Sequence, residues 1–326
     1  MKNYKKIQVV SLNSAVTGGP EALHHLVYEL NSLGICAEII YFPFGQDCPV
    51  PDQYINFCKQ PGRLEDNIGN LVVFPEILPM EALKIKNADA AIWWLSVDNF
   101  LVSKQINGLI DKMHYYQKAL RGQRPWGGLN SLKNLTHYSQ SRYASEFLQT
   151  AGIKFAEVFE PINNRFLTNN LDFLNAHTKR NEILYNPIKR FDITSSLIKS
   201  FPDIIFTPLK GFTRDELSKK LATSKAYIDF GHHPGRDRLP REAAMHGCCI
   251  VTGQLGAAKN TIDISIPYQY KLDHRSPSFV QEFKILIDAL FENTQKHIDL
   301  FQDYRSQIMS EPIVFKQTLT KLFQKS

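Results

Sequence analysis

The stretch from residue 227 to 258, YIDFGHHPGRDRLPREAAMHGCCIVTGQLGAA, constrains the fold of this chain more than any other. Residues 227–230 are rich in β-forming side chains and predict a buried strand. A polar loop with glycine and proline follows, and Pro240 suits the first turn of a helix. Gly247 ends that helix before a second strand at 248–252. Strand, charged loop, helix and strand predict a parallel α/β sheet, whose carboxyl edge is where ligands bind.

Cationic side chains gather in this loop and at the start of the helix. They are His232, His233, Arg236, Arg238 and Arg241. The N–H groups and the dipole of a helix N-terminus attract anions, and guanidinium groups match phosphate oxygens. The cluster therefore predicts a site for a phosphate or diphosphate. Asp237 and Glu242 lie among these cations, and the alternative is a solvated helix start with Arg–Asp surface pairs.

Residues 241–252, REAAMHGCCIVT, resemble the nucleotide-sugar-binding motif of group 1 (family 4-like) retaining glycosyltransferases. The family pattern ends in Glu-Ala-Met/Ala-Ala-x-Gly-x-Pro-Val-Val, and Glu242 matches its glutamate, which binds the ribose hydroxyls of the donor. A plain helix-start carboxylate is the other reading of Glu242. The family has a second glutamate eight positions earlier, where this chain has Pro234. The resemblance implies an α/β protein of the GT-B fold, with two Rossmann-like domains whose parallel sheets face across a cleft.

The resemblance also implies a division of the chain, whose 326 residues suffice for two domains of ordinary size. We expect an acceptor-side Rossmann-like domain, a nucleotide-sugar-binding Rossmann-like domain, and a terminal helix that crosses back to the first domain. Their bounds are 1–165, 166–305 and 306–326. The polar, Asn-rich residues 161–180 predict the linker. Toward the C-terminus we expect a last strand at 267–272 and amphipathic helices at 279–291 and 298–323.

Two glycines follow the first predicted strand, residues 7–12. Gly18 and Gly19 precede a helix that Pro20 opens, which predicts a βαβ unit. Without a full GxGxxG pattern, the pair is a weak dinucleotide fingerprint. In the family a similar loop approaches the donor phosphate, and an ordinary tight turn is the equal alternative.

Two carboxylates follow neighbouring predicted strands of the first domain. Glu76 comes after the strand at 71–74, and Asp98 after the strand at 88–95. Because the carboxyl ends of parallel strands open onto one edge, we expect both to contact the acceptor or to handle its proton. Each also suits a cap or loop position. The aromatic rings beside Asp98 suit sugar stacking or core packing, and these are Trp93, Trp94 and Phe100.

A basic pair, Lys189 and Arg190, follows a predicted strand at 182–185. In the family a basic pair after this strand grips the donor diphosphate. Surface charges beside a helix are the alternative. Residues 104–122 have helical spacing, and the basic loop that follows carries Trp126, which suits an acceptor, a membrane headgroup or simply solvent.

The net charge of +6 suits an anionic donor, an anionic membrane surface or nucleic acid. No nucleic-acid module or continuous basic tract occurs, so we do not expect nucleic acid as a partner. No apolar run is long enough to span a bilayer. The five cysteines are odd in number and lack metal-ligand spacing, which indicates reduced thiols and a cytoplasmic protein. A lipid-linked acceptor would place it at the inner face of the membrane, as a peripheral contact.

The features together predict a metal-independent glycosyltransferase. It would move a sugar from a nucleotide-diphosphate sugar to a glycan or lipid-linked acceptor, with retention, in cell-surface polysaccharide or lipopolysaccharide synthesis. The donor is a co-substrate, and we expect no other cofactor and no metal, because no Asp-x-Asp occurs and protein cations and helix ends offset the diphosphate. The alternatives are a GT-B relative with other chemistry (a nucleotide-sugar epimerase or a glucosylating enzyme of nucleic acid) and a non-catalytic glycan-binding protein.

Overall fold

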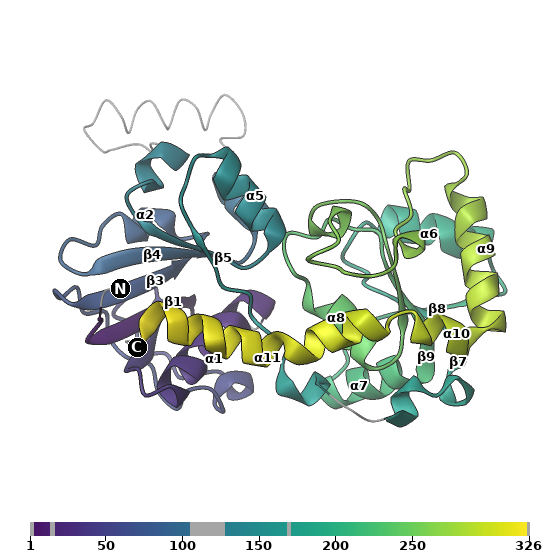
Figure 1. Cartoon of the computed structure of the whole chain (residues 1–326), viewed down its shortest axis with the longest axis horizontal. Helices are drawn as coiled ribbons and strands as arrows, with labels where there is room; N and C mark the ends of the chain where they lie inside the picture. Colours follow the sequence, from purple (N-terminus) through teal and green to yellow (C-terminus); the bar gives the residue numbers. More distant parts are fainter. Residues whose placement is uncertain (1–2, 14–16, 105–127, 168–170, 325–326) are drawn as a thin grey trace. The chain divides into compact units, whose positions relative to one another are not determined.

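The computed structural model describes residues 3–13, 17–104, 128–167 and 171–324 (Figure 1). Contacts within the chain define two compact units. Unit 1 comprises residues 1–160 and 313–326, and unit 2 comprises residues 161–312. The helix and the Trp126 loop that we expect after Lys104 lie outside the described residues.

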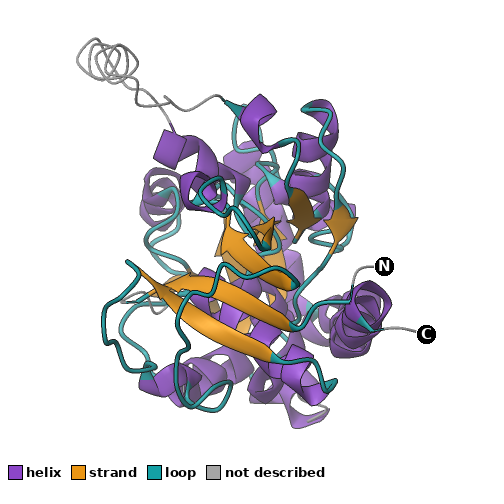
Figure 2. Ribbon diagram, turned by 90° about the vertical axis from the view of Figure 1, so that its left-hand side faces the viewer, coloured by secondary structure: helices purple, strands orange, loops and turns teal. Residues whose placement is uncertain are grey.

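Unit 1 is built on a six-stranded sheet of order β2-β1-β3-β4-β5-β6, in which every pair is parallel. Helices lie on either side of this twisted layer (Figure 2). The strands are β1 (Lys6–Leu12), β2 (Ala37–Phe42), β3 (Asn70–Pro75), β4 (Asp89–Trp94), β5 (Thr136–Ser139) and β6 (Ala156–Glu157). The helices lying wholly within its described residues are α1 (Gly18–Ser32), α2 (Pro79–Ala82), α3 (Val97–Lys104) and α5 (Arg142–Thr150).

Both faces of the unit 1 sheet are buried, because successive side chains of a strand point to opposite faces. Val9 packs in the core on one face and Val10 in the core on the other. Trp93 and Trp94 divide between the same two cores and have no exposed surface. The aromatic rings beside Asp98 therefore pack in the protein interior rather than on a sugar.

Unit 2 has a four-stranded parallel sheet of order β10-β9-β7-β8. Its strands are β7 (Arg180–Tyr185), β8 (Ile205–Pro208), β9 (Ser224–Asp229) and β10 (Cys249–Thr252). Its helices are α6 (Phe191–Ser200), α7 (Arg214–Thr223), α8 (Arg238–Met245), α9 (Phe279–Glu292) and α10 (Thr294–Asp299), followed by α11 (Gln302–Phe323), which continues into unit 1. The strand, loop, helix and strand predicted for residues 227–258 are confirmed as β9, the loop to Asp237, α8 and β10.

One expectation for the C-terminal part is wrong. Residues 267–272 do not form a strand; they contain a 3-10 turn, Tyr268–Tyr270, and a single bridge from Lys271 to Thr252. Pro267 lacks an N–H for a strand ladder, and the ring of Tyr270 is buried from the turn. The helix expected at 298–323 is confirmed as α11, which begins only at Gln302 because residues 298 and 299 end α10.

Helix α11 contributes to both hydrophobic cores. Ile308 packs in the core of unit 2, whereas Phe315, Leu319 and Phe323 pack in a core of unit 1. Pro312 lies within the helix at the boundary between these segments.

Among the described residues, no helix is both long and apolar enough to cross a membrane.

Candidate functional site

The strand order of unit 2 defines one place at its carboxyl edge where a ligand would be expected. The chain runs from β7 to β8 on one side and returns to β9 on the other side of β7. The loops after β7 and β9 therefore diverge, and the crevice at such a switch point is where open α/β sheets bind ligands. These loops, residues 186–190 and 230–237, carry half of the predicted donor-binding residues.

Four charged side chains form an ion-pair cluster at this switch point, two of them buried and two partly exposed. They are Lys189, Asp229, His233 and Asp237. The Lys189 ammonium lies 3.6 Å from Asp229 Oδ2 and in short contact with Asp237 Oδ2. His233 Nδ1 lies 2.8 Å from Asp237 Oδ2, without the alignment of a straight hydrogen bond, and Nε2 lies 3.7 Å from Asp229 Oδ1. Although burial opposes it, His233 and Lys189 lower the pKa of Asp237 to about 2.

Asp229 is also fixed by neutral donors. The Tyr227 hydroxyl donates to its Oδ2 at 3.1 Å, and the Gly231 N–H donates to its Oδ1 at 3.0 Å. A Cβ atom on Gly231 would lie 2.5 Å from Lys189 Cβ, so the loop approaches Lys189 closely only because residue 231 is glycine. The ion-pair cluster thus depends on the course of the backbone as well as on its charges.

The loop after β9 is joined to the turn after β10, residues 253–257. The His233 N–H donates to Leu255 O at 3.4 Å, and the Ala257 N–H donates to His233 O at 2.8 Å. Gly256 has a φ of +60°, and a Cβ atom there would lie 2.2 Å from His233 O. The two loops therefore form one continuous piece of the carboxyl edge.

Two of the predicted cations are buried against a carboxylate of α11. Arg236 Nη2 lies 2.5 Å from Glu311 Oε1, and Arg241 Nη1 lies 2.6 Å from Glu311 Oε2. Arg241 also donates to the backbone carbonyls of Arg236, at 2.7 Å, and Asp237, at 3.3 Å. Two guanidinium groups share one carboxylate, so this triad carries one net positive charge beside the loop.

The other predicted donor-site residues differ in exposure. His232 is exposed, Arg238 is half-buried, and Glu242 on α8 has 8 % of its surface exposed. Arg190 precedes α6 with a left-handed backbone (φ 43°), and its side chain is 43 % exposed and pairs with Asp192. The structure thus brings the predicted donor-site residues of unit 2 to one edge of its sheet, some of them buried and others exposed, whereas Gly18 and Gly19 lie in unit 1.

Asp229, His233 and Asp237 also have the chemistry of metal ligands. One ligand atom of each lies within 4.8 Å of the others. The Lys189 ammonium already contacts both carboxylates, so a divalent ion would have to displace it. We therefore describe these residues as an ion-pair cluster.

In unit 1, Glu76 and Asp98 lie at the carboxyl ends of adjacent strands β3 and β4. Glu76 has 3 % of its surface exposed, and its Oε2 accepts the Leu95 N–H at 3.0 Å. Burial raises its pKa to about 7. Gly18 and Gly19 form the first residues of α1.

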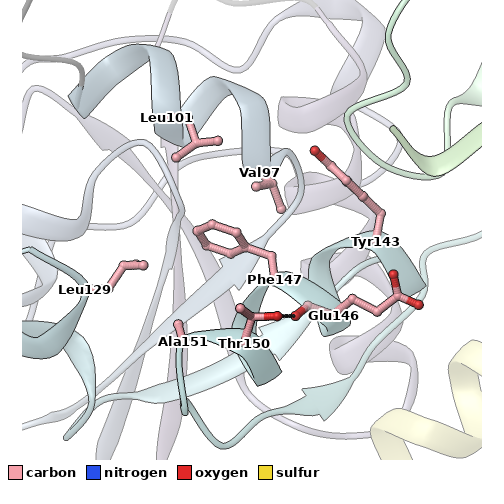
Figure 3. Close-up of a pocket in the computed structure, with 8 residues that line it drawn as sticks. All are labelled: Val97, Leu101, Leu129, Tyr143, Glu146, Phe147, Thr150 and Ala151. Carbon is pink, nitrogen blue, oxygen red and sulfur yellow. Dashed lines mark hydrogen bonds between the residues drawn. The ribbon is translucent and has the colours of Figure 1, made fainter. Parts of the chain in front are cut away.

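Asp98 lies in the first turn of α3, where its Oδ1 accepts the Tyr143 hydroxyl at 3.2 Å. Tyr143 also lines an apolar pocket of about 370 Å³ between α3 and α5 (Figure 3). Leu101, Leu129 and Phe147 contribute side chains to it, and Glu146 is its one carboxylate among the described lining residues. Asp98 is thus held next to an apolar surface of unit 1.

Sequence reasoning missed two site residues. Asp229 ends a predicted strand at the ligand edge, so its position was a usable signal. Glu311 lies 70 residues after Arg241, and the hydrophobic pattern of a helix does not reveal which cation a helix carboxylate will meet.

No protein-family model matches the sequence, and no curated protein sequence matches it significantly. Solved structures do match it over nearly its whole length. HepE of Anabaena, solved in complex with UDP-glucose, is 12 % identical with a TM-score of 0.60, over 97 % of this chain and 99 % of that one. Sucrose-phosphate synthase of Thermosynechococcus elongatus is 10 % identical with a TM-score of 0.65, over 98 % of each chain. The pneumococcal O-GlcNAc transferase GtfA, solved with UDP and GlcNAc, is 10 % identical with a TM-score of 0.57, again over 98 % of each. With two parallel sheets flanked by helices, the chain has the α/β architecture of these GT-B proteins.

Proposed function

We propose that this protein transfers a sugar from a nucleotide-diphosphate sugar to a glycan or lipid-linked acceptor, with retention, in cell-surface polysaccharide or lipopolysaccharide synthesis. One observation carries the proposal. Glu242 and the predicted cations come together at the switch point of the unit 2 sheet, where an anionic nucleotide would bind. The similarity in fold to HepE, which is solved with UDP-glucose, supports a nucleotide sugar as that ligand.

We assign the roles of the cations according to the exposure of their side chains. We assign the direct contact with the diphosphate to the more exposed ones, which are Arg190, His232 and Arg238. The buried Arg236 and Arg241, and the partly exposed Lys189, which is paired with two aspartates, shape the loop and add to the positive potential. The Glu242 carboxylate would accept hydrogen bonds from the ribose hydroxyls, as the motif implies.

In the proposed reaction the bond from the sugar C1 to the diphosphate oxygen breaks, and a bond from C1 to the acceptor oxygen forms. The leaving phosphate takes the proton of the acceptor hydroxyl, so no separate base is required. Protein cations and helix N-termini offset the charge of the leaving diphosphate, and we propose that no metal or other cofactor takes part. Gly18 and Gly19 would approach the donor phosphate, and Glu76 and Asp98 would face the acceptor.

A calorimetric titration in EDTA with UDP, GDP, ADP and CMP sugars tests the donor. We expect one nucleotide class to bind and to stabilise the protein by about 2.7 kcal/mol at a hundred times its Kd. Transfer to lipid-linked and free glycan acceptors would then be assayed with that donor. Binding of no nucleotide sugar would contradict the proposal, and binding without transfer to any acceptor would favour a glycan-binding protein.

A further inference from the structure

We propose that His233 is a positioning residue of the donor site, whose imidazolium, held between Asp229 and Asp237, fixes the loop 230–237 against the turn 253–257. This inference deepens the proposed function and rests on it, because these are the loops to which we assign the donor. It distinguishes His233 from its neighbour His232, although the sequence presents the two histidines as equivalent.

The two histidines differ in the exposure of their side chains. His233 has no exposed surface, whereas His232 is exposed. A side chain without exposed surface does not reach a ligand at the edge of the sheet. The polar atoms of His233 instead meet the backbone of the turn and the two aspartates.

The positive and negative charges of the ion-pair cluster are equal in number when His233 is protonated. Lys189 and protonated His233 contribute two positive charges, and Asp229 and Asp237 contribute two negative ones. With a neutral residue at 233, the cluster, in which Asp229 is buried and Asp237 partly exposed, would hold one uncompensated negative charge. Such a charge is costly in a protein interior, so the loop would rearrange to bring one carboxylate to water.

Charged groups face His233 from three elements of unit 2. Asp229 faces it from β9, Asp237 from the start of α8, and Lys189 from the loop after β7. The turn 253–257 presents backbone groups and contains no ionisable side chain. Burial alone would lower the pKa of His233, and the two aspartates together raise it above 6.5.

The raised pKa of His233 makes the stability of the folded protein depend on pH. Because the folded state holds the proton more tightly than the unfolded chain, the stabilisation is complete below about pH 6.5. It is lost as the pH rises through the higher value of the folded protein. Donor affinity should fall over the same interval, because the loops that we assign to the donor lose their fixed arrangement.

Three variants of the full chain test the charge argument. His233→Asn leaves the cluster with one excess negative charge, and we expect donor binding to weaken by about tenfold or more at pH 6.5. Asp237→Asn with His233→Asn restores the balance of Lys189 and Asp229, and we expect the double variant to regain most of the affinity. Asp237→Asn alone should resemble the double variant, because His233 then faces one carboxylate fewer and releases its proton, which leaves Lys189 balanced by Asp229. His177→Asn, the matched control, removes an exposed imidazole of unit 2 that lies outside both loops, and it should change neither the donor affinity nor the arrangement of the loops.

Hydrogen exchange provides a readout that does not depend on the donor. In His233→Asn we expect faster exchange in residues 230–237 and 253–257, with β7 and α9 unchanged, and recovery in the double variant. The affinity of the wild type should fall from pH 6.5 to pH 9, and that of the double variant should vary much less. Faster exchange in the loops, recovered in the double variant, would support positioning even if the wild type bound no nucleotide sugar, and only the proposed function would then fail.

Two outcomes would overturn the inference. Weaker donor binding with unchanged exchange in both loops would mean that His233 contacts the donor itself. Stabilisation of the wild type by Mn²⁺ or Zn²⁺, absent in His233→Asn, would mean that Asp229, His233 and Asp237 bind a metal ion in place of the Lys189 ammonium.

Discussion

Glu76 shows how one buried carboxyl group links stability to pH. Burial raises its pKa from 4.5 to about 7, although backbone N–H groups of Leu95 and Ser96 oppose the shift. The folded state therefore favours the protonated form, and stability is lost as the pH rises from about 4.5 through 7. A shift of this size corresponds to about 3 kcal/mol.

Glu76→Gln should remove that loss, because the amide stays neutral and still accepts an N–H. Relative to the wild type, we expect the free energy of unfolding of the variant to increase by about 3 kcal/mol between pH 5 and pH 8. Urea unfolding at several pH values measures it. A constant difference for Glu76→Gln would contradict the assignment.

Glu242 is the single residue that the motif assigns to the donor ribose. If its carboxylate holds the ribose, Glu242→Ala should weaken nucleotide binding by about tenfold to a hundredfold, since hydrogen bonds to a charged group contribute about 1.5–3 kcal/mol. Calorimetry with the selected nucleotide measures the affinity, and circular dichroism checks the fold. Glu292→Ala, at an exposed residue of α9, should change neither. Unfolding of Glu242→Ala, with full affinity in the folded fraction, would make Glu242 a structural residue.

Among the elements, α7 has a complete capping box. Thr213 Oγ1 accepts the Glu216 N–H at 3.3 Å, and the Thr213 N–H donates to Glu216 Oε2 at 2.8 Å. Thr213→Ala should lower the free energy of unfolding by about 1 kcal/mol, whereas Thr213→Ser should retain most of it. Urea unfolding of both variants compares them, and equal losses would show that the methyl group matters rather than the hydroxyl.

Helix α11 is tied to the loop before α8 by Glu311. Removing this carboxylate leaves two buried guanidinium groups without their shared partner. We expect Glu311→Ala to destabilise unit 2 by about 3–5 kcal/mol. Asp288→Asn removes an exposed partner of Lys284 on α9 and should cost less than about 1 kcal/mol. Similar losses in the two variants, measured by chemical unfolding, would show that the triad adds little.

The predictable part of the fold was the part set by local pattern. The run at residues 227–258 carried its own strand, loop and helix signals, and β9, α8 and β10 followed them. The strand expected at 267–272 failed because apolar residues in a short segment also suit a turn whose side chains enter the core. Donor-site residue types were predictable, but their partners were not. Glu311 meets Arg236 and Arg241 only through packing of α11, which local sequence does not encode.

For the whole molecule, the last residues of α11 should stabilise unit 1. Leu319 is fully buried in a unit 1 core. All three tryptophans occur between residues 1 and 160, so their fluorescence reports on that unit. Leu319→Ala should lower the unfolding free energy that this fluorescence follows by about 2–5 kcal/mol. Ile308→Ala, in the unit 2 core on the same helix, is the control, and an equal effect from it would mean that the units unfold together.

The division of α11 between two cores has a consequence for biosynthesis. Domains of a nascent chain usually fold in the order in which the ribosome releases them. Here residues 1–160 leave the ribosome first, yet Phe315, Leu319 and Phe323 complete one of their cores only after all of unit 2 has been made. Unit 2 comprises only residues up to 312, so it takes no core residue from the last part of the chain. The first unit to be synthesised is therefore the last to have all of its core residues, and until then its incomplete apolar surface is open to chaperones.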